Sequence, residues 1–230
     1  MTGHLTYSSY LHLPELLATT RPNAACDDSM TWAGERYFII CHQSSELWLS
    51  QILVDLGESA RFSQEGAWSH STRRLWRVSS MVELLIQQLG RLVYLSRADF
   101  QRFRPSLQGA SGAQSAQCLE VLQIADQPDI RAIGVNLAVV LADHGLDRPH
   151  QLGACRHDSC GAAHAVDHLI ATVGDWRRLH LQVARHFIGD SPGSGGSDGV
   201  AYLRAQLDGS SASPPSQSAT AAAPSCGQEK

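Results

Sequence analysis

Apolar residues recur every three to four positions through long stretches of this sequence. The spacing is clearest over about Glu35 to Leu56 and about Ser71 to Tyr94. It places the apolar side chains on one stripe of a helix, so that two such helices can pack face to face. Sustained alternation of apolar and polar residues, rich in Val, Ile and Thr as a strand requires, does not occur in the sequence. The sequence therefore predicts an all-α fold.

Glycines mark the expected ends of the longest helices. Gly57 is expected to end the first helix, and Gly189 with the following SPGSGGSDG is expected to end a third, over about Ala162 to Ile188. Shorter helices are expected at about Arg97 to Phe103, Ala113 to Ile124 and Ile130 to Asp143. Apolar residues make up 43% of the 230 residues, which suits one globular domain, residues 1–208. Ser, Pro and Ala dominate residues 209–230, which predicts a disordered tail.

The charge and apolar distributions exclude several classes of partner. Acidic residues outnumber basic ones by 22 to 18, and no basic stripe suits a phosphate backbone, so nucleic acid is not an expected partner. No stretch approaches the roughly 18 apolar residues that span a bilayer, so no membrane association is expected and the predicted location is the cytoplasm. The six cysteines follow no framework spacing, which predicts mostly free thiols.

Two histidines, His42 and His180, need either a hydrogen-bond partner in the core or a functional role. The segment YFIICHQSSELWLSQIL puts His42 inside an otherwise apolar helix, with Phe38 one turn before it and Glu46 one turn after it. A buried imidazole must be hydrogen-bonded, and a core histidine bonded to a carbonyl would satisfy that rule as well as a functional one. His180 lies near the end of a helix and presents the same two readings, because a single imidazole is not a metal motif.

Four motifs in chain order resemble those of the tryptophan 2,3-dioxygenase family. The helix segment around His42 resembles its F-I-x-x-H-Q-x-x-E-L-W hallmark. The other matching segments are TYSSYLHLPELL, FRPSLQGASGAQSAQ and WRRLHLQVARHFIGDSPGSGGSDGVAYLR. The resemblance implies a helical bundle with a haem pocket between its helices.

The resemblance also implies roles around the cofactor. His180 is the implied axial ligand to the iron of haem b, which leaves the opposite iron position for O2. Ser111 and Gly112 match a loop that lies against the haem. His42 is implied to bond the indole N–H of the substrate, and its role as a catalytic base or only as a positioning group stays open. Phe38 is implied to pack against the indole ring.

Further residues match the family's amino-acid contacts. Arg104 matches an arginine that clamps the substrate carboxylate, for which the planar guanidinium is well suited. Ser194 stands where the family usually has a threonine that reaches the carboxylate and ammonium. Tyr7 and Tyr10 match aromatic residues that reach into a neighbouring subunit, which implies a homo-oligomer, a dimer of dimers.

The implied activity is haem-dependent addition of O2 to the indole C2–C3 bond of L-tryptophan, with ring cleavage. Departures from the family pattern enlarge the pocket and make it less polar: Phe100 replaces a tyrosine, Ala113 replaces a phenylalanine, and no tryptophan lies in residues 82–92. Residues 125–169 are also shorter than the family's stretch. A β-substituted tryptophan is therefore an alternative substrate, and monooxygenation to an oxindole or hydroxylated product in secondary metabolism is an alternative reaction.

Three other classes of function are compatible with parts of the sequence. A non-catalytic haem sensor would need His180 but not Arg104 and Ser194 together. The string ACRHDSCGAAH offers zinc ligands, namely Cys155, His157, Cys160 and His164, at spacings that fit no common zinc module. A helical scaffold without a cofactor is the third, and it predicts no haem spectrum.

Overall fold

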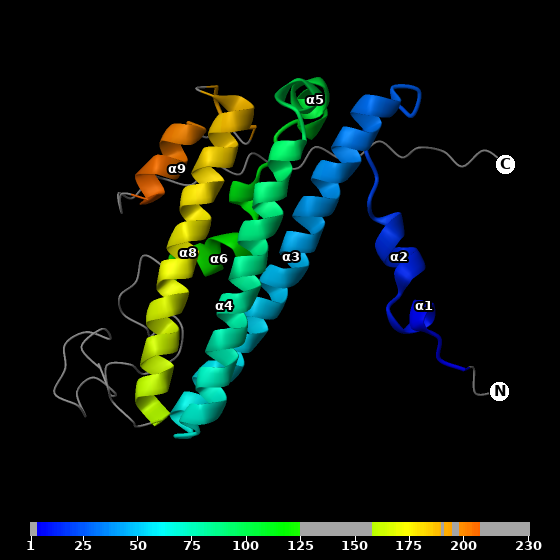
Figure 1. Cartoon of the computed structure of the whole chain (residues 1–230). Coiled ribbons are helices and arrows are strands. Elements are labelled where there is room, and N and C mark those ends of the chain that lie inside the picture. The colour runs from blue at the N-terminus through cyan, green and yellow to red at the C-terminus, as the bar shows by residue number, and fades with distance from the viewer. Residues whose placement is uncertain (1–3, 125–157, 190, 195–197, 208–230) are drawn as a thin grey trace.

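The computed structural model describes residues 4–124, 158–189, 191–194 and 198–207. Three long helices, α3 (Ser29–Gln64), α4 (Trp68–Arg91) and α8 (Asp158–Ile188), run side by side (Figure 1). The described parts of the chain contain no strand, and the predicted all-α fold is confirmed. The helix expected at Ile130 to Asp143 and the tail lie outside the described residues, as does most of the segment 125–169.

Helix α3 is longer than the apolar stripe predicts. Its N-terminus is capped by Asp28, whose carboxylate accepts a hydrogen bond from the Thr31 N–H at 3.1 Å. The expected end at Gly57 is wrong, because the helix continues to Gln64 and the chain turns at Gly66, where φ is +71°. Glycine costs only about 1 kcal/mol inside a helix. Burial of Ser59 against α4, beyond Gly57, keeps this turn helical.

The other elements follow the predicted pattern to different degrees. α5 (Arg97–Phe103) has the predicted bounds, and α8 starts at Asp158, four residues earlier than expected, and ends as predicted before Gly189, where φ is +56°. α6 begins later than expected, because Ser115 caps it by accepting from the Cys118 N–H. The other elements are α1 (Tyr7–Tyr10), α2 (Leu13–Ala18), α9 (Val200–Leu207), α6 (Ala116–Gln123) and 3-10 helices at Leu92–Tyr94, Arg104–Leu107 and Gly112–Gln114.

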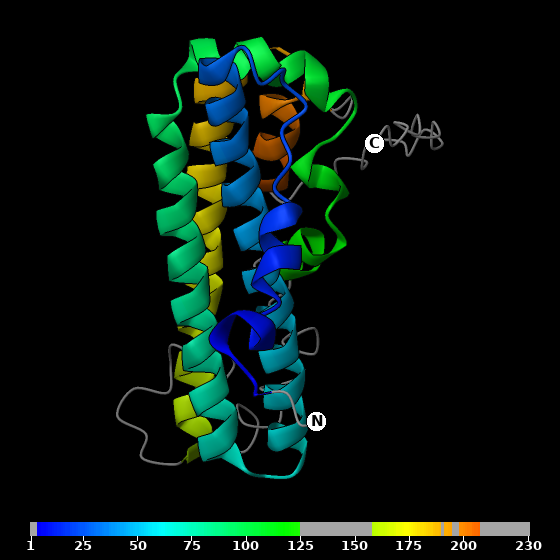
Figure 2. The same ribbon diagram turned by 90° about the vertical axis from the view of Figure 1, so that its right-hand side faces the viewer.

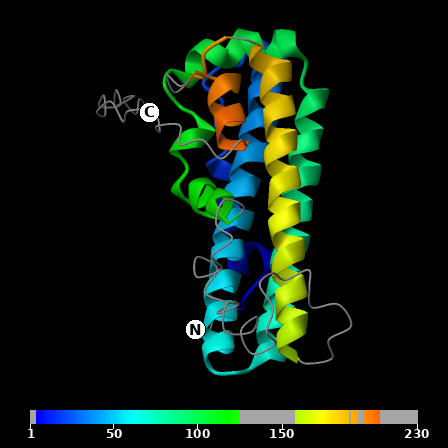
Figure 3. The ribbon, with the colours of Figure 1, turned by 90° about the vertical axis from the view of Figure 1, so that its left-hand side faces the viewer.

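The long helices form the frame that positions everything else. α4 packs against both α3 and α8. α6 contacts α3 and α8, α9 contacts α8, and both short helices lie on the same side of α8 (Figure 3). α1 and α2 lie beside α3 on the side away from α8 (Figures 1 and 2).

The core consists of two apolar clusters. The larger one is built where α4 packs between α3 and α8, and includes Leu49, Ile52, Val78, Leu85 and Val166. Alanines at positions 162, 163 and 165 of α8 are fully buried in it, and their small side chains let α8 approach α4 closely. The second cluster lies at the α5 end and comprises Leu92, Leu95, Phe100, Phe103, Val183 and Phe187. Four residues of the second cluster, Leu92, Phe100, Val183 and Phe187, also line the cavity described below.

One further expectation needs correction. Cys26, Cys41 and Cys118 are free thiols as predicted, but Cys160 is disulfide-bonded. Sequence spacing could not anticipate this bond, because a disulfide depends on which cysteines the fold brings within reach. Within the described ranges, no helix is long and apolar enough to cross a membrane.

Candidate active site

A cavity of about 390 Å³ lies between α3, α4, α8 and the chain that follows α5, a size typical of ligand pockets. Six of the nine predicted site residues line it, namely Phe38, His42, Ser111, Gly112, His180 and Ser194. The rest of the wall is mainly apolar and includes Leu89, Leu92, Phe100, Val183, Ala184 and Phe187. The fold thus gathers residues from four distant sequence segments around one space.

His42 is held by its own helix. Its Nδ1 lies 2.8 Å from the carbonyl oxygen of Phe38, one turn earlier in α3. A carbonyl oxygen only accepts, so Nδ1 carries the proton and the neutral ring keeps Nε2 as an acceptor. Burial lowers the pKa of His42, although the hydrogen bond to Phe38 and the charge of Glu46 oppose that shift. His42 therefore presents a neutral acceptor within a cavity that Phe38 also lines.

His180 shares the cavity with His42. It lies on α8 and also lines two smaller hollows that adjoin the cavity. Burial, followed by the effect of the nearby His42, lowers the pKa of His180 to about 4. A neutral imidazole with an available nitrogen is the form that binds a metal. Val183 and Ala184, one turn further along α8, add an apolar wall, so the donor and its surroundings fit a haem.

Arg104 stands beside the cavity and does not line it. Its Nη2 donates to the Pro192 carbonyl oxygen at 2.5 Å, so the guanidinium is tied to the loop that carries Ser194. Ser194 itself lines the cavity. A guanidinium has five N–H donors, and this contact occupies one of them. Arg104 thus binds the loop at Pro192, two residues before Ser194, so the two predicted carboxylate contacts lie at the same loop.

Tyr7 and Tyr10 lie away from the cavity. Both are on α1, with 76% and 67% of their surfaces exposed. Neither appears in the cavity wall that the described residues form. Their predicted function in a neighbouring subunit stays a prediction.

Phe100 defines the apolar end of the cavity. Its ring lies 5.8 Å from that of Phe38, 5.4 Å from that of Phe103 and 4.8 Å from that of Phe187. The side chain is almost fully buried. This end of the cavity therefore has no hydroxyl from position 100, in agreement with the less polar pocket expected from the sequence.

Glu46 is a cavity residue that was not among the predicted site residues. It lies one turn after His42 on the same stripe of α3, and its Oε2 accepts hydrogen bonds from Ser115 Oγ at 3.0 Å and Gln117 Nε2 at 2.9 Å. The sequence signal that could have identified Glu46 is its position four residues after His42, which places both side chains on one face of the helix. Cys118 lines the two smaller hollows, and burial, followed by the charge of Glu46, raises the pKa of its thiol to about 12.

The alternative zinc site has little structural support. Cys155 and His157 lie outside the described residues, Cys160 is disulfide-bonded and His164 is exposed. In the described part of the chain, no group of three or more His, Cys, Asp or Glu side chains is placed to hold a metal ion.

Comparison with known proteins agrees with this geometry. The family model for tryptophan 2,3-dioxygenase matches residues 1–125. The tryptophan 2,3-dioxygenase of Anaeromyxobacter dehalogenans (strain 2CP-C) is 30% identical, over 88% of this chain and 91% of that protein. The chain belongs to the tryptophan 2,3-dioxygenase family. The enzymes of the same name from Anaeromyxobacter sp. (strain K) and Arthrobacter sp. (strain FB24) are 27% and 26% identical over 88% and 90% of this chain, and 91% and 88% of theirs.

Membership of the tryptophan 2,3-dioxygenase family makes this protein a haem-dependent oxygenase. The matched part, residues 1–125, contains α3, which carries Phe38 and His42, and the segment with Ser111 and Gly112. His180 lies beyond that match but within the same cavity.

Proposed function

We propose that this enzyme uses haem b and O2 to oxidise the indole C2–C3 bond of L-tryptophan or of a β-substituted tryptophan. The observation that carries the proposal is that His42 and His180 line one largely apolar cavity, together with Phe38. A neutral imidazole suited to iron and a neutral acceptor suited to an indole N–H are the two groups that such a reaction needs at one site.

In this proposal, His180 holds the haem iron through its free ring nitrogen. When bound, haem would activate dioxygen for attack on the electron-rich indole ring. Ser111 and Gly112 form the wall of the haem side. The apolar side chains of Val183, Ala184 and Phe187 exclude water there, which strengthens every polar contact inside the cavity.

His42 and Phe38 would orient the indole ring. His42 Nε2 accepts the indole N–H, because Nδ1 is already committed to the Phe38 carbonyl. The Phe38 ring, whose centroid is 4.0 Å from that of His42, packs against the indole. This geometry supports a positioning role for His42, and the same Nε2 is the atom that would take the proton in base catalysis.

Arg104 and Ser194 would hold the carboxylate and ammonium groups of the substrate. The guanidinium keeps N–H donors beyond the one that binds Pro192, and Ser194 adds a hydroxyl from the same loop. Phe100 in the cavity wall contributes no hydroxyl, and the small Ala113 lines an adjoining hollow. Both features support an amino acid with extra bulk near its β-carbon. The subunit partner proposed for completing the site is a second copy that inserts Tyr7 and Tyr10, in a dimer of dimers.

The deciding experiment measures product mass. The protein is purified with haem supplied, its spectrum is recorded, and L-tryptophan or β-methyltryptophan is added under O2 with a reductant. A gain of two oxygen atoms means dioxygenation with ring cleavage, and this is the expected result. A gain of one oxygen atom means monooxygenation. A haem spectrum without turnover of any indole amino acid overturns the proposed activity and favours a sensor.

A further inference from the structure

The wall of the cavity opposite α8 is a connecting segment, residues 104–117, with little regular structure. It contains two short 3-10 helices, Arg104–Leu107 and Gly112–Gln114. Between them, Gln108 has a φ of +52°, an uncommon conformation for a residue other than glycine. Ser111 and Gly112 of this segment line the cavity. Within the segment, the Gln114 side chain accepts from the Ser111 N–H and donates to the Gly109 carbonyl oxygen. These bonds shape the turn, and contacts with other elements fix where it lies relative to His42.

Glu46 is the side chain of α3 that binds the end of this segment. One carboxylate oxygen, Oε2, accepts from both Ser115 and Gln117. The Ser115 hydroxyl donates its single proton to Glu46 and accepts from the Cys118 N–H, where it caps α6. Hydrogen bonds to an ionised carboxylate are roughly twice as strong as neutral ones. The start of α6 is thus bound to α3 one turn after His42.

The other end of α6 is bound to the helix that carries His180. The Arg177 guanidinium donates from Nη2 to the carbonyl oxygen of Leu122, in the last turn of α6. Arg177 lies three residues before His180 on α8. α6 is therefore tied to both histidine helices, each time within one turn of the histidine.

A second carboxylate of α3, which unlike Glu46 is fully buried, binds the other end of the segment more weakly. Glu35, which is 1% exposed, accepts from the Ala24 N–H at 2.7 Å, and its Oε1 lies 3.3 Å from the hydroxyl of Ser106. That hydroxyl also donates to the Phe103 carbonyl oxygen at 2.6 Å, so its single proton is not reserved for Glu35. The stronger anchor of the segment is Glu46.

We propose that Glu46 is a positioning residue, which holds the Ser111 and Gly112 wall at a fixed place relative to His42 through its hydrogen bonds to Ser115 and Gln117. The expected effect of Glu46 on KM rests on the proposed oxygenase function. The structural consequence of the proposal is independent of that function, because the hydrogen bonds exist whether or not the cavity turns over an indole.

The test compares Glu46→Ala with Glu46→Gln in the full chain with haem supplied. Alanine removes the acceptor, whereas the glutamine amide oxygen can still accept from Ser115 and Gln117. Glu120→Gln, an exposed position on α6, is the matched control. Amide hydrogen exchange of the peptide that covers residues 108–119 is measured by mass spectrometry, together with kcat and KM for L-tryptophan.

Glu46→Ala is expected to speed exchange in this peptide and to raise KM on the order of tenfold, with a smaller change in kcat. Glu46→Gln is expected to stay close to the wild type in both measurements. Equal effects of the two substitutions would show that the negative charge acts rather than the positioning, and would overturn the proposal. Unchanged exchange and KM in Glu46→Ala would overturn it as well.

Two further measurements cover the cases in which Glu46→Ala does not fold or the wild-type protein shows no turnover. If Glu46→Ala does not fold, Gln117→Ala removes one of the two donors and keeps the Ser115 cap of α6, and smaller changes of the same sign in exchange and KM are expected. If the wild-type protein turns over no indole amino acid, the proposed function fails, while hydrogen exchange still decides whether Glu46 fixes the wall.

Discussion

His42 donates its Nδ1–H to the carbonyl oxygen of Phe38 at 2.8 Å, one turn away on the same helix. This bond selects the tautomer, so Nε2 remains an acceptor. The two rings are also packed together, with centroids 4.0 Å apart. One helical turn thus combines a hydrogen-bond acceptor with an aromatic surface, the two features that the proposed indole contact requires.

Methylation of the indole nitrogen should reveal the role of His42. 1-Methyl-L-tryptophan has no N–H to donate, so the wild-type enzyme should prefer L-tryptophan by a factor of about 10 or more in kcat/KM, as expected for one hydrogen bond left unmade where the bound substrate excludes water. The variant His42→Ala should lose this preference, because neither substrate finds an acceptor. Retention of the full preference in His42→Ala would refute the assignment.

Haem binding should depend on His180 alone among the histidines of α8. His180→Ala is expected to abolish the Soret band of protein purified with haem supplied, because the iron loses its protein ligand. His164→Ala, at an exposed position of the same helix, is the control and should keep the spectrum. An unchanged haem spectrum in His180→Ala would overturn the assignment of the ligand.

Substrate carboxylate binding should require the shape of arginine at position 104 and not only its charge. Arg104→Lys keeps the charge but loses the planar pair of donors and the bond to Pro192. KM for L-tryptophan is therefore expected to rise about tenfold, with kcat changing less. Arg102→Lys, an exposed neighbour paired with Asp99, should leave both constants unchanged. The same response in both variants would argue against a clamp.

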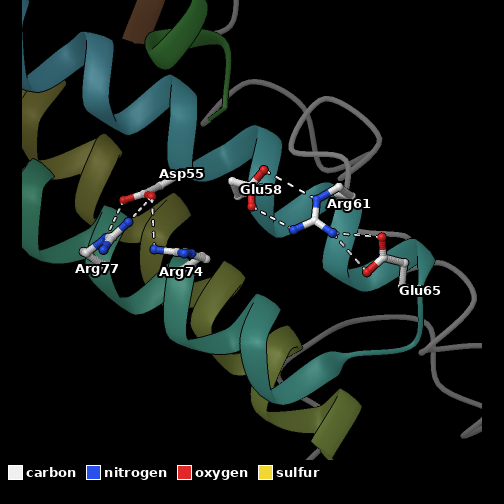
Figure 4. A network of polar contacts seen from close by, with 6 residues as sticks. All are labelled: Asp55, Glu58, Arg61, Glu65, Arg74 and Arg77. Atoms are coloured by element: carbon white, nitrogen blue, oxygen red, sulfur yellow. Dashed lines mark hydrogen bonds and ion pairs between the residues drawn. The ribbon is translucent and has the colours of Figure 1, made fainter.

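A buried ion pair between α3 and α4 should matter for stability. Asp55 is 1% exposed and accepts from Arg77 Nε at 2.6 Å, with Arg74 Nη1 at 3.7 Å (Figure 4). Asp55→Ala removes the buried partner and leaves partly exposed arginines that water can solvate, so the free energy of unfolding should fall by about 2 kcal/mol. Urea denaturation measures this.

Glu58→Gln is the control for that substitution. Glu58 and Arg61 form an exposed pair on α3 (Figure 4). Exposed pairs contribute little to stability, so the urea midpoint should stay nearly unchanged. An equal loss in the two variants would show that burial of Asp55 is not the cause.

The thiol of Cys118 should resist alkylation in the folded protein. Its pKa is raised to about 12 by burial and by the charge of Glu46, so at pH 8 only about one molecule in 10,000 carries the reactive thiolate. The exposed Cys26 should react with iodoacetamide first, as peptide mass spectrometry can follow. In urea, both should react at similar rates. Rapid labelling of native Cys118 would contradict the burial.

Sequence periodicity sufficed for the long helices but not for all their ends. The stripes of α3 and α4 and the bounds of α5 followed from local spacing, because helical hydrogen bonds join residues only four positions apart. Gly57 misled the prediction, since whether a glycine ends a helix depends on what the next turn can bury. Ser59 buries against α4, and that contact belongs to the tertiary structure.

The motifs likewise identified six residues that share the cavity, but not how they are held. The roles of Glu46 and of the Arg104 bond to Pro192 depend on contacts between residues 69 and 88 positions apart, and one sequence carries no record of such distances. The disulfide at Cys160 was missed for the same reason.

By itself, the sequence determined that this chain is helical, that His42 and His180 lie on helices beside apolar residues, and that its motifs are those of the tryptophan 2,3-dioxygenase family. Only the tertiary structure decided that His42 and His180 meet in one cavity, that Arg104 stands beside that cavity, and that α6 links the two histidine helices. The physical reason is that secondary structure follows from neighbours along the chain, whereas a site is made by burial and hydrogen bonds between segments that only packing brings together.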